Sequence, residues 1–307
     1  MSLFSCDKTT GGSRRGGLSL LELIVALGIL AALSTVAVRA LDPLADQARY
    51  EVTLRVLDQL RVATIGDHAA KQTDGQRIIS GFLADTGTLP STLADLTALP
   101  AGIDAYSVQS FDSDRDSVDD VTISSGWNGP YVHLGAGQSS LVDGWGRSPL
   151  IDPDAGDFDF TSRGSDGDAI APEDGYRADL SVTIPSSDYT SSTVVFRLFA
   201  IDGTTGTRID PAPTGIEQLG VLFYSVNGNG GTTGAIEEIT LPVAATGTFE
   251  VTRTNLVHGR AAARAFLWSD TDADDQLDVG EPVLFSSYVH YFSVIGGIDS
   301  RIEMELR

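Results

Sequence analysis

The stretch that decides the fold is Gly16-Gly17-Leu18-Ser19-Leu20-Leu21-Glu22, followed by uncharged, largely apolar sequence to Val38. Between residues 18 and 38 the only charged side chain is that of Glu22. A helix of this length rises about 1.5 Å per residue and spans roughly 30 Å, the thickness of a hydrocarbon core. The pattern therefore predicts a transmembrane helix at 18–38. Because an isolated carboxylate is costly in such a segment, Glu22 is expected to have a function.

The leader before this helix is polar and basic, and its small-residue pair precedes the apolar run. An ordinary secretory signal is cleaved after its apolar run, so the order here keeps the helix in the mature protein. Arg14 and Arg15 before the span predict a cytoplasmic N-terminus and an exported C-terminal part.

Composition excludes some classes of partner. The chain has 42 Asp and Glu against 20 Lys and Arg, with a formal net charge of −22. Such an acidic surface repels nucleic acid and favours hard cations such as calcium. The single cysteine, Cys6, lies in the leader, so we expect no disulfide framework.

Beyond the span, the apolar spacing predicts one helix from about Leu18 to about Thr73, with a kink at Pro43. From residue 181 onward, short β-runs alternate with glycine-rich turns and predict a β-sandwich. These runs are Ser181–Ile184, Val194–Ile201, Val221–Val226, Ile236–Leu241, Thr248–Thr252, Arg264–Trp268, Val283–Phe285, Tyr288–Val294 and Ile302–Leu306.

Five pieces of sequence occur in an order that resembles one known family. They are Gly16–Glu22, Gly81–Pro90, Gly126-Trp127-Asn128-Gly129-Pro130-Tyr131, Asp143-Gly144-Trp145-Gly146 and Gly156–Asp168, which leads on to Ala178-Asp179-Leu180. The order resembles that of type IV pilin-like proteins and of the major pseudopilins of type II secretion. The resemblance covers about residues 14–181.

This resemblance implies a filament subunit. A prepilin peptidase would cut between Gly17 and Leu18 and methylate the new amino terminus. Glu22 would pair with the amino-terminal cation of a neighbouring subunit and fix the register of a homo-oligomeric filament. Other pseudopilins and inner-membrane secretion components would be partners, and the protein would lie in the bacterial inner membrane as a single-pass protein with periplasmic C-terminal domains. Asp166 and Asp179 would hold calcium.

The expected fold is α+β: a pilin-like fold, with a long N-terminal transmembrane helix packed on a small antiparallel sheet, and then a C-terminal all-β sandwich-like domain. We expect a leader at 1–17, a long helix at 18–75, a globular head at 76–181 and a β extension at 182–307. A head doubled in size leaves open whether the subunit is a major or a minor one.

A second acidic loop predicts calcium from its spacing alone. Asp270, Asp272, Asp274, Asp278 and Glu281 stand at positions 1, 3, 5, 9 and 12 of an EF-hand-type loop. A solvated acidic hairpin is the alternative. Residues 112–120 show the same opening without a glutamate at position 12, and here a solvated loop and a metal site stay equally open.

No catalytic motif accompanies these features. The four histidines are scattered, and neither a G-x-S-x-G elbow nor a phosphate-binding glycine loop is present. We therefore expect a protein that is not an enzyme. Two alternatives to the secretion-type filament are a type IV pilin-like surface adhesin, whose β domain binds a ligand, and a hydrolase or carbohydrate-binding module on a pilin-like stalk.

Overall fold

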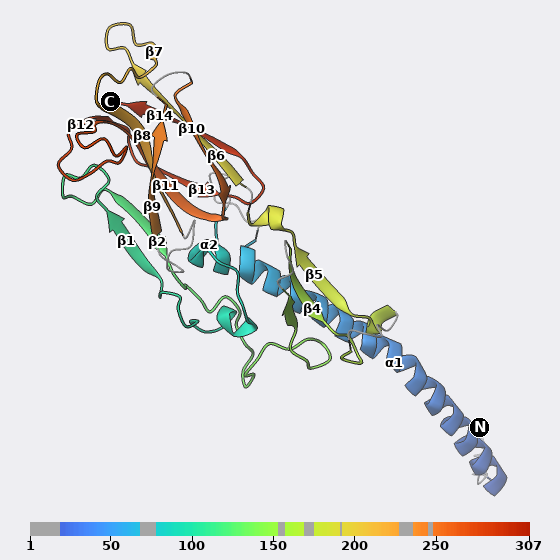
Figure 1. Cartoon of the computed structure of the whole chain (residues 1–307). Coiled ribbons are helices and arrows are strands. Elements are labelled where there is room, and N and C mark those ends of the chain that lie inside the picture. Colours follow the sequence, from blue (N-terminus) through green and yellow to red (C-terminus); the bar gives the residue numbers. More distant parts are fainter. Residues whose placement is uncertain are drawn as a thin grey trace, which may run out of the picture. The chain divides into compact units, whose positions relative to one another are not determined.

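The computed structural model of the chain describes residues 19–67, 78–152, 157–168, 175–190, 192–226, 236–244 and 248–307, without the side chains of 36–41. The chain divides into two compact units, Met1–Ala48 and Arg49–Arg307. Figure 1 labels the helices and strands. Gly17 and Leu18, where processing is expected, lie outside the described residues.

One helix, α1 (Leu20–Ile65), begins in the first unit and ends in the second. Ser19 and Glu22 form a reciprocal cap at its start, with Glu22 N donating to Ser19 Oγ at 3.2 Å and Ser19 N donating to Glu22 Oε2 at 3.3 Å. The helix ends where Gly66 takes a left-handed φ of 79°, and Gly66 N donates to Val62 O at 2.8 Å.

In the second unit, the last turns of α1 pack on a small antiparallel sheet of order β3-β4-β5. Its strands are β3 (Leu150–Asp152), β4 (Phe158–Ser162) and β5 (Leu180–Ile184). Leu57 and Leu60 of α1 share a buried cluster with Phe158 and Phe160 of β4. Short helices complete this region, namely α2 (Phe82–Thr86), η1 (Leu93–Leu96), η2 (Gly175–Arg177) and η3 (Ser186–Asp188).

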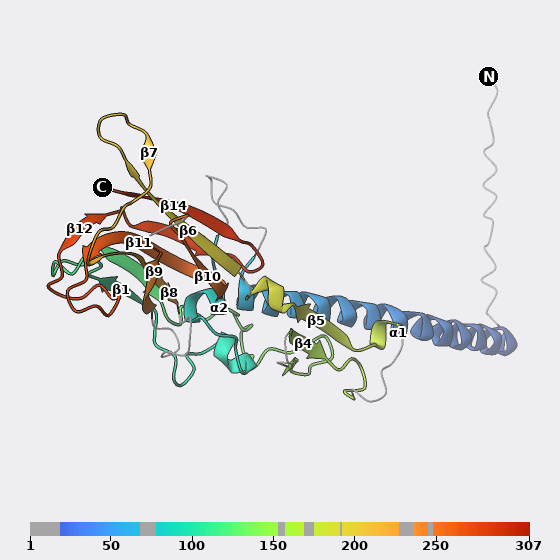
Figure 2. The ribbon, with the colours of Figure 1, turned by 45° about the horizontal axis from the view of Figure 1, so that its top comes forward.

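The remaining strands form a β-sandwich (Figures 1 and 2). One sheet has the order β10-β6-β14, with β7 on β6, and β14 runs parallel to β6. The other has the order β12-β11-β8-β9, with β13 on β11. The strands are β6 (Ser192–Ile201), β7 (Arg208–Ile209), β8 (Glu217–Val226), β9 (Ile236–Val243), β10 (Glu250–Leu256), β11 (Gly259–Ser269), β12 (Val283–Ser286), β13 (His290–Val294) and β14 (Ser300–Leu306).

Successive side chains of β8 and β11 point to opposite faces of the β12-β11-β8-β9 sheet, referred to below as the second sheet. Because both strands are apolar at most positions, both faces of this sheet are apolar. Leu219, Val221 and Phe223 of β8 face the first sheet, in a core shared with Phe196 of β6. Tyr224, Phe266 and Trp268 face the other way.

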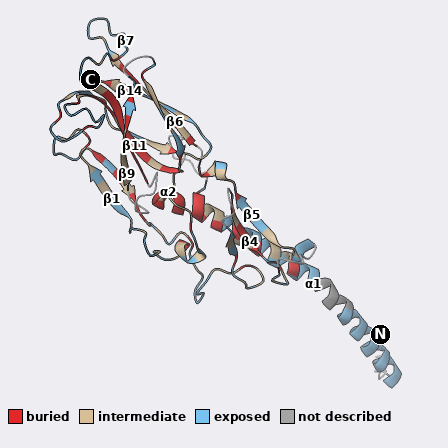
Figure 3. Ribbon diagram, in the orientation of Figure 1, coloured by how far each residue is buried: buried red, intermediate tan, exposed pale blue. Residues whose placement is uncertain are grey.

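This outer face is covered by a hairpin of β1 (Ser107–Phe111) and β2 (Val121–Ser125). Val121 and Ile123 of β2 are buried against it. The hairpin is therefore a third layer on the sandwich, and Figure 3 shows the buried residues of β11 between the layers.

The expected fold class is wrong. The described secondary-structure elements are mostly β-strands, fourteen of them against one helix longer than five residues. None of the helices in the described part of the chain has a stretch that is both long and apolar enough to cross a membrane. The transmembrane description of 18–38 is corrected accordingly, and so is the expected single-pass location in the bacterial inner membrane.

Candidate calcium-binding loops

The loop 270–281, named here the Asp270 loop, joins β11 to β12 and brings its first three aspartates together. Carboxylate oxygens of Asp270, Asp272 and Asp274 lie within 4.8 Å of one another. The side chains of Asp270 and Glu281 are almost fully buried, at 3% and 8% exposure. Asp278 is exposed. The residue types fit a hard cation, because all are oxygen donors.

The backbone of the Asp270 loop has the sharp turns that an EF-type loop needs. Ala273 and Asp275, at positions 4 and 6, have left-handed φ values of 64° and 62°. Asp270 Oδ2 accepts a hydrogen bond from Asp275 N at 3.1 Å, which closes this turn. Aspartate tolerates this conformation better than most residues, so Asp275 replaces the glycine usual at position 6.

The second half of the loop is anchored in the core. Leu277, at position 8, is buried against Trp268. Trp268 Nε1 donates to Gln276 O, the backbone oxygen at position 7, at 3.1 Å. Glu281 Oε1 accepts from Thr271 N at 2.6 Å, which ties the last position to the first turn.

The carboxylates of the Asp270 loop have no cationic partner in the part of the chain that the structure describes. Among the described residues, no cationic side chain lies within ion-pair distance of Asp270, Asp272, Asp274 or Glu281. Desolvation and the neighbouring carboxylates of Asp274 and Glu281 raise the pKa of Asp272. A divalent cation would relieve this repulsion.

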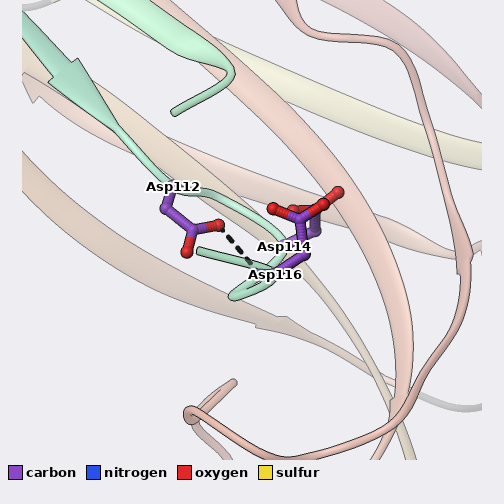
Figure 4. Close-up of side chains that lie close together, drawn as sticks. All are labelled: Asp112, Asp114 and Asp116. Carbon is purple, nitrogen blue, oxygen red and sulfur yellow. Dashed lines mark hydrogen bonds between the residues drawn. The ribbon is translucent and has the colours of Figure 1, made fainter. Parts of the chain in front are cut away.

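The loop 112–120, the Asp112 loop, joins β1 to β2 and has the same backbone pattern. Arg115 and Ser117, again at positions 4 and 6, have φ values of 60° and 74°. Asp112 Oδ2 accepts from Ser117 N at 2.7 Å. Figure 4 shows Asp112 beside Asp114 and Asp116, whose oxygens also lie within 4.8 Å of one another. Unlike the Asp270 loop, it is paired with arginine, because Arg264 Nη1 lies 3.1 Å from Asp114 Oδ2.

Asp166 and Asp179 lie near each other but form no group of three carboxylates among the described residues. Desolvation, and then the charge of Asp166, raise the pKa of Asp179. Asp179 Oδ1 is a buried oxygen without a hydrogen-bond donor in the described part. Glu173 and Asp174, two further acidic residues between them in the sequence, lie outside the described residues.

Glu22 is exposed and caps α1. This capping role was not among the expectations for Glu22, although Ser-x-x-Glu before an apolar run is a helix-start pattern. The described structure therefore gives Glu22 a local partner, Ser19, in addition to the intersubunit role expected for it.

An ion pair whose carboxylate is buried was not expected from the sequence. Arg260 Nη1 of β11 lies 2.8 Å from Asp85 Oδ1 of α2, and Tyr131 Oη donates to Asp85 Oδ2 at 3.0 Å. The two charges are 175 residues apart in sequence, so no local pattern reveals them. Burial raises the pKa of Asp85, although Arg260 and Tyr131 act in the opposite direction.

No protein-family model matches the chain, and no curated protein matches it. The pseudopilin and secretion-system assignment thus has no support from relatives. With the mostly β structure and the absence of a membrane-spanning stretch in the described helices, the description as a transmembrane pseudopilin is withdrawn.

Proposed function

We propose that this protein is a structural, non-enzymatic subunit of a homo-oligomeric filament, assembled through the N-terminal part of α1. The observation that supports this is the exposure of apolar side chains on all sides of the helix. Nine large ones between Leu20 and Leu33 are 51–76% exposed: Leu20, Leu21, Leu23, Ile24, Val25, Leu27, Ile29, Leu30 and Leu33. A helix that is apolar all round requires a cover, since each Leu or Ile buried contributes about 1.5–3 kcal/mol.

The cover we propose is the same segment of other copies. From Ser19 to Thr35 the helix carries no charge except that of Glu22, so identical segments meet without repulsion over most of their length. Gly28 has nothing within 4 Å of the position of an added Cβ, which leaves room for close approach of a second helix. The resemblance of Gly17-Leu18…Glu22 to prepilin processing motifs supports the same proposal, with a prepilin peptidase acting before Leu18.

Assembly is tested by placing a charge on the helix. We expect Leu27→Asp in the full chain to abolish filaments seen by electron microscopy and sedimentation, because an unpaired carboxylate would enter an apolar contact. Val108→Asp is the matched control, since Val108 of β1 is 63% exposed and lies outside α1. Filaments from Leu27→Asp in normal amount would refute the proposal.

Glu22 is tested with a substitution that separates its two roles. Glutamine keeps the capping box but removes the charge. If Glu22 pairs with a neighbour's amino terminus, Glu22→Gln keeps the helix content measured by circular dichroism and still loses filaments. Unimpaired assembly of this variant would leave Glu22 with the cap alone.

We also propose that calcium binds the Asp270 loop. Asp270, Asp272, Asp274, the Gln276 carbonyl, Asp278 and Glu281 would hold the ion, which would supply the positive charge that the loop lacks. The proposal is supported by the crowding of these carboxylates, none of which has an arginine or lysine within ion-pair distance among the described residues.

Calcium is tested by comparing thermal unfolding in calcium and in chelator. Binding stabilises the folded state by mass action, so the wild-type midpoint is expected to rise with calcium. Asp272→Asn should remove most of this rise and leave the midpoint in chelator unchanged or higher, because it relieves repulsion. Equal wild-type midpoints with and without calcium would contradict the proposal.

A further inference from the structure

Arg264 lies in the middle of β11, on the face that meets the β1–β2 hairpin. Its strand partner is Leu222 of β8, and its side chain is only 14% exposed. Arg264 Nη1 lies 3.1 Å from Asp114 Oδ2 and also forms an ion pair with Asp120. The guanidinium therefore contacts positions 3 and 9 of the Asp112 loop, two positions that hold the ion in an EF-type loop.

The guanidinium of Arg264 also makes hydrogen bonds and a ring contact outside the two aspartates. Arg264 Nε donates to Ser287 O and Nη2 to Ser286 Oγ, both at 3.0 Å. Nη1 also donates to Ser113 Oγ at 2.9 Å, and the charged group lies 5.1 Å from the centre of the Phe266 ring. These contacts fix the orientation of the planar guanidinium and aim Nη1 at the loop.

We propose that Arg264 is the resident cation of the Asp112 loop, which is held to the sandwich by this guanidinium and takes no calcium. The two loops share one backbone pattern but differ in two ligand positions. Position 12 is Glu281 in the Asp270 loop and Ile123 in the Asp112 loop, where the side chain is buried in the core. Position 9 of the Asp112 loop, Asp120, is engaged by Arg264 and accepts from Ser113 N at 2.9 Å.

A second arginine, which belongs to the Asp112 loop itself, also joins the loop to the sandwich. Arg115 forms an ion pair with Glu238 of β9 and donates from Nε to Leu277 O of the Asp270 loop at 3.2 Å. The hairpin is thus joined to the second sheet by two arginine contacts that need no metal.

Calcium binding to the full chain tests the proposal directly. We expect Asp114→Asn and Asp116→Asn each to bind the same number of calcium ions per chain as the wild type in equilibrium dialysis. Loss of one ion in either variant would overturn the proposal. The result does not depend on whether the Asp270 loop binds calcium, because a wild type that binds none would refute only that separate proposal.

Unfolding tests the role of the guanidinium. Arg264→Gln should lower the unfolding midpoint by roughly 5–10 °C, and by the same amount in calcium and in chelator. Arg264→Lys, which keeps the charge, should lower it less and covers the case in which the glutamine variant fails to fold. Arg208→Gln is the matched control at an exposed ion pair. A midpoint for Arg264→Gln no lower than that of the control would overturn the proposal.

Discussion

Replacing Arg260 by glutamine should cost more stability than replacing its partner Asp85 by asparagine. The side chain of Asp85 is 4% exposed and that of Arg260 is 34% exposed. Arg260→Gln leaves a buried carboxylate without its cation, which typically costs about 3–5 kcal/mol. Asp85→Asn leaves a guanidinium that can reach water, and the new amide can still accept from Tyr131, so we expect a cost of about 1–2 kcal/mol.

The cost of Arg260→Gln should also grow with pH. Burial already raises the pKa of Asp85 in the folded protein, and loss of Arg260 removes the main opposing effect. Between the unfolded pKa and this higher folded pKa, the native state keeps a proton that the unfolded state releases. The free energy of unfolding therefore falls as pH rises through that window, by at most about 1.4 kcal/mol per pH unit. Below it the carboxyl is neutral in both states, and only a hydrogen bond is lost.

Urea unfolding of the two variants and the wild type, from about pH 4 to about pH 8, measures both effects. Arg208→Gln provides the control, because Arg208 and Glu303 are 59% and 40% exposed and such pairs contribute about 0–1 kcal/mol. If Arg260→Gln costs no more than the control, or if its cost is independent of pH, the reasoning from burial fails.

Two further predictions concern packing. Gly144→Ala should destabilise the protein by about 1–3 kcal/mol in urea unfolding, because an added Cβ would lie 2.0 Å from Arg49 O; an unchanged midpoint would show that α1 can shift there at no cost. Phe223→Ala should cost about 3–5 kcal/mol in the same measurement, because its fully buried ring lies between the two sheets; a loss under about 1 kcal/mol would place the core elsewhere.

The strands of the sandwich were largely predictable from local sequence. Eight of the nine β-runs read between residues 181 and 306 overlap strands of the sandwich, because glycine-rich turns and apolar alternation are local properties. The ninth, Ser181–Ile184, is β5 of the small sheet and was wrongly assigned to the sandwich. What the alternation did not reveal was the third layer. The run from Leu219 to Val226 is apolar at almost every position, which is typical of a strand buried on both faces. From this run one could have predicted that another element covers the outer face of the second sheet.

Membrane topology was the part that failed: it was inferred from the apolar run at 18–38, but no helix in the described part of the chain has a stretch long and apolar enough to cross a membrane. The contacts between segments distant in the sequence were not predicted, for another reason. Asp85 and Arg260 come from segments that are each ordinary by themselves, and only the packing of α2 against β11 makes them a pair. Composition indicates an excess of acidic residues, but it does not indicate which carboxylates form ion pairs with arginine.

The two acidic loops show that local sequence determines their backbone conformation but not which cation neutralises their carboxylates. Asp-x-Asp-x-Asp is enough to set the backbone, since both loops have left-handed residues at positions 4 and 6 and both use the first aspartate to close the turn. What differs is the cation that faces the carboxylates. Arg264, on a strand about 150 residues away, pairs with the Asp112 loop, whereas no arginine or lysine among the described residues lies within ion-pair distance of the Asp270-loop carboxylates. A D-x-D-x-D pattern therefore predicts the turn, and the residue at position 12 together with any arginine on the facing strand predicts what neutralises it.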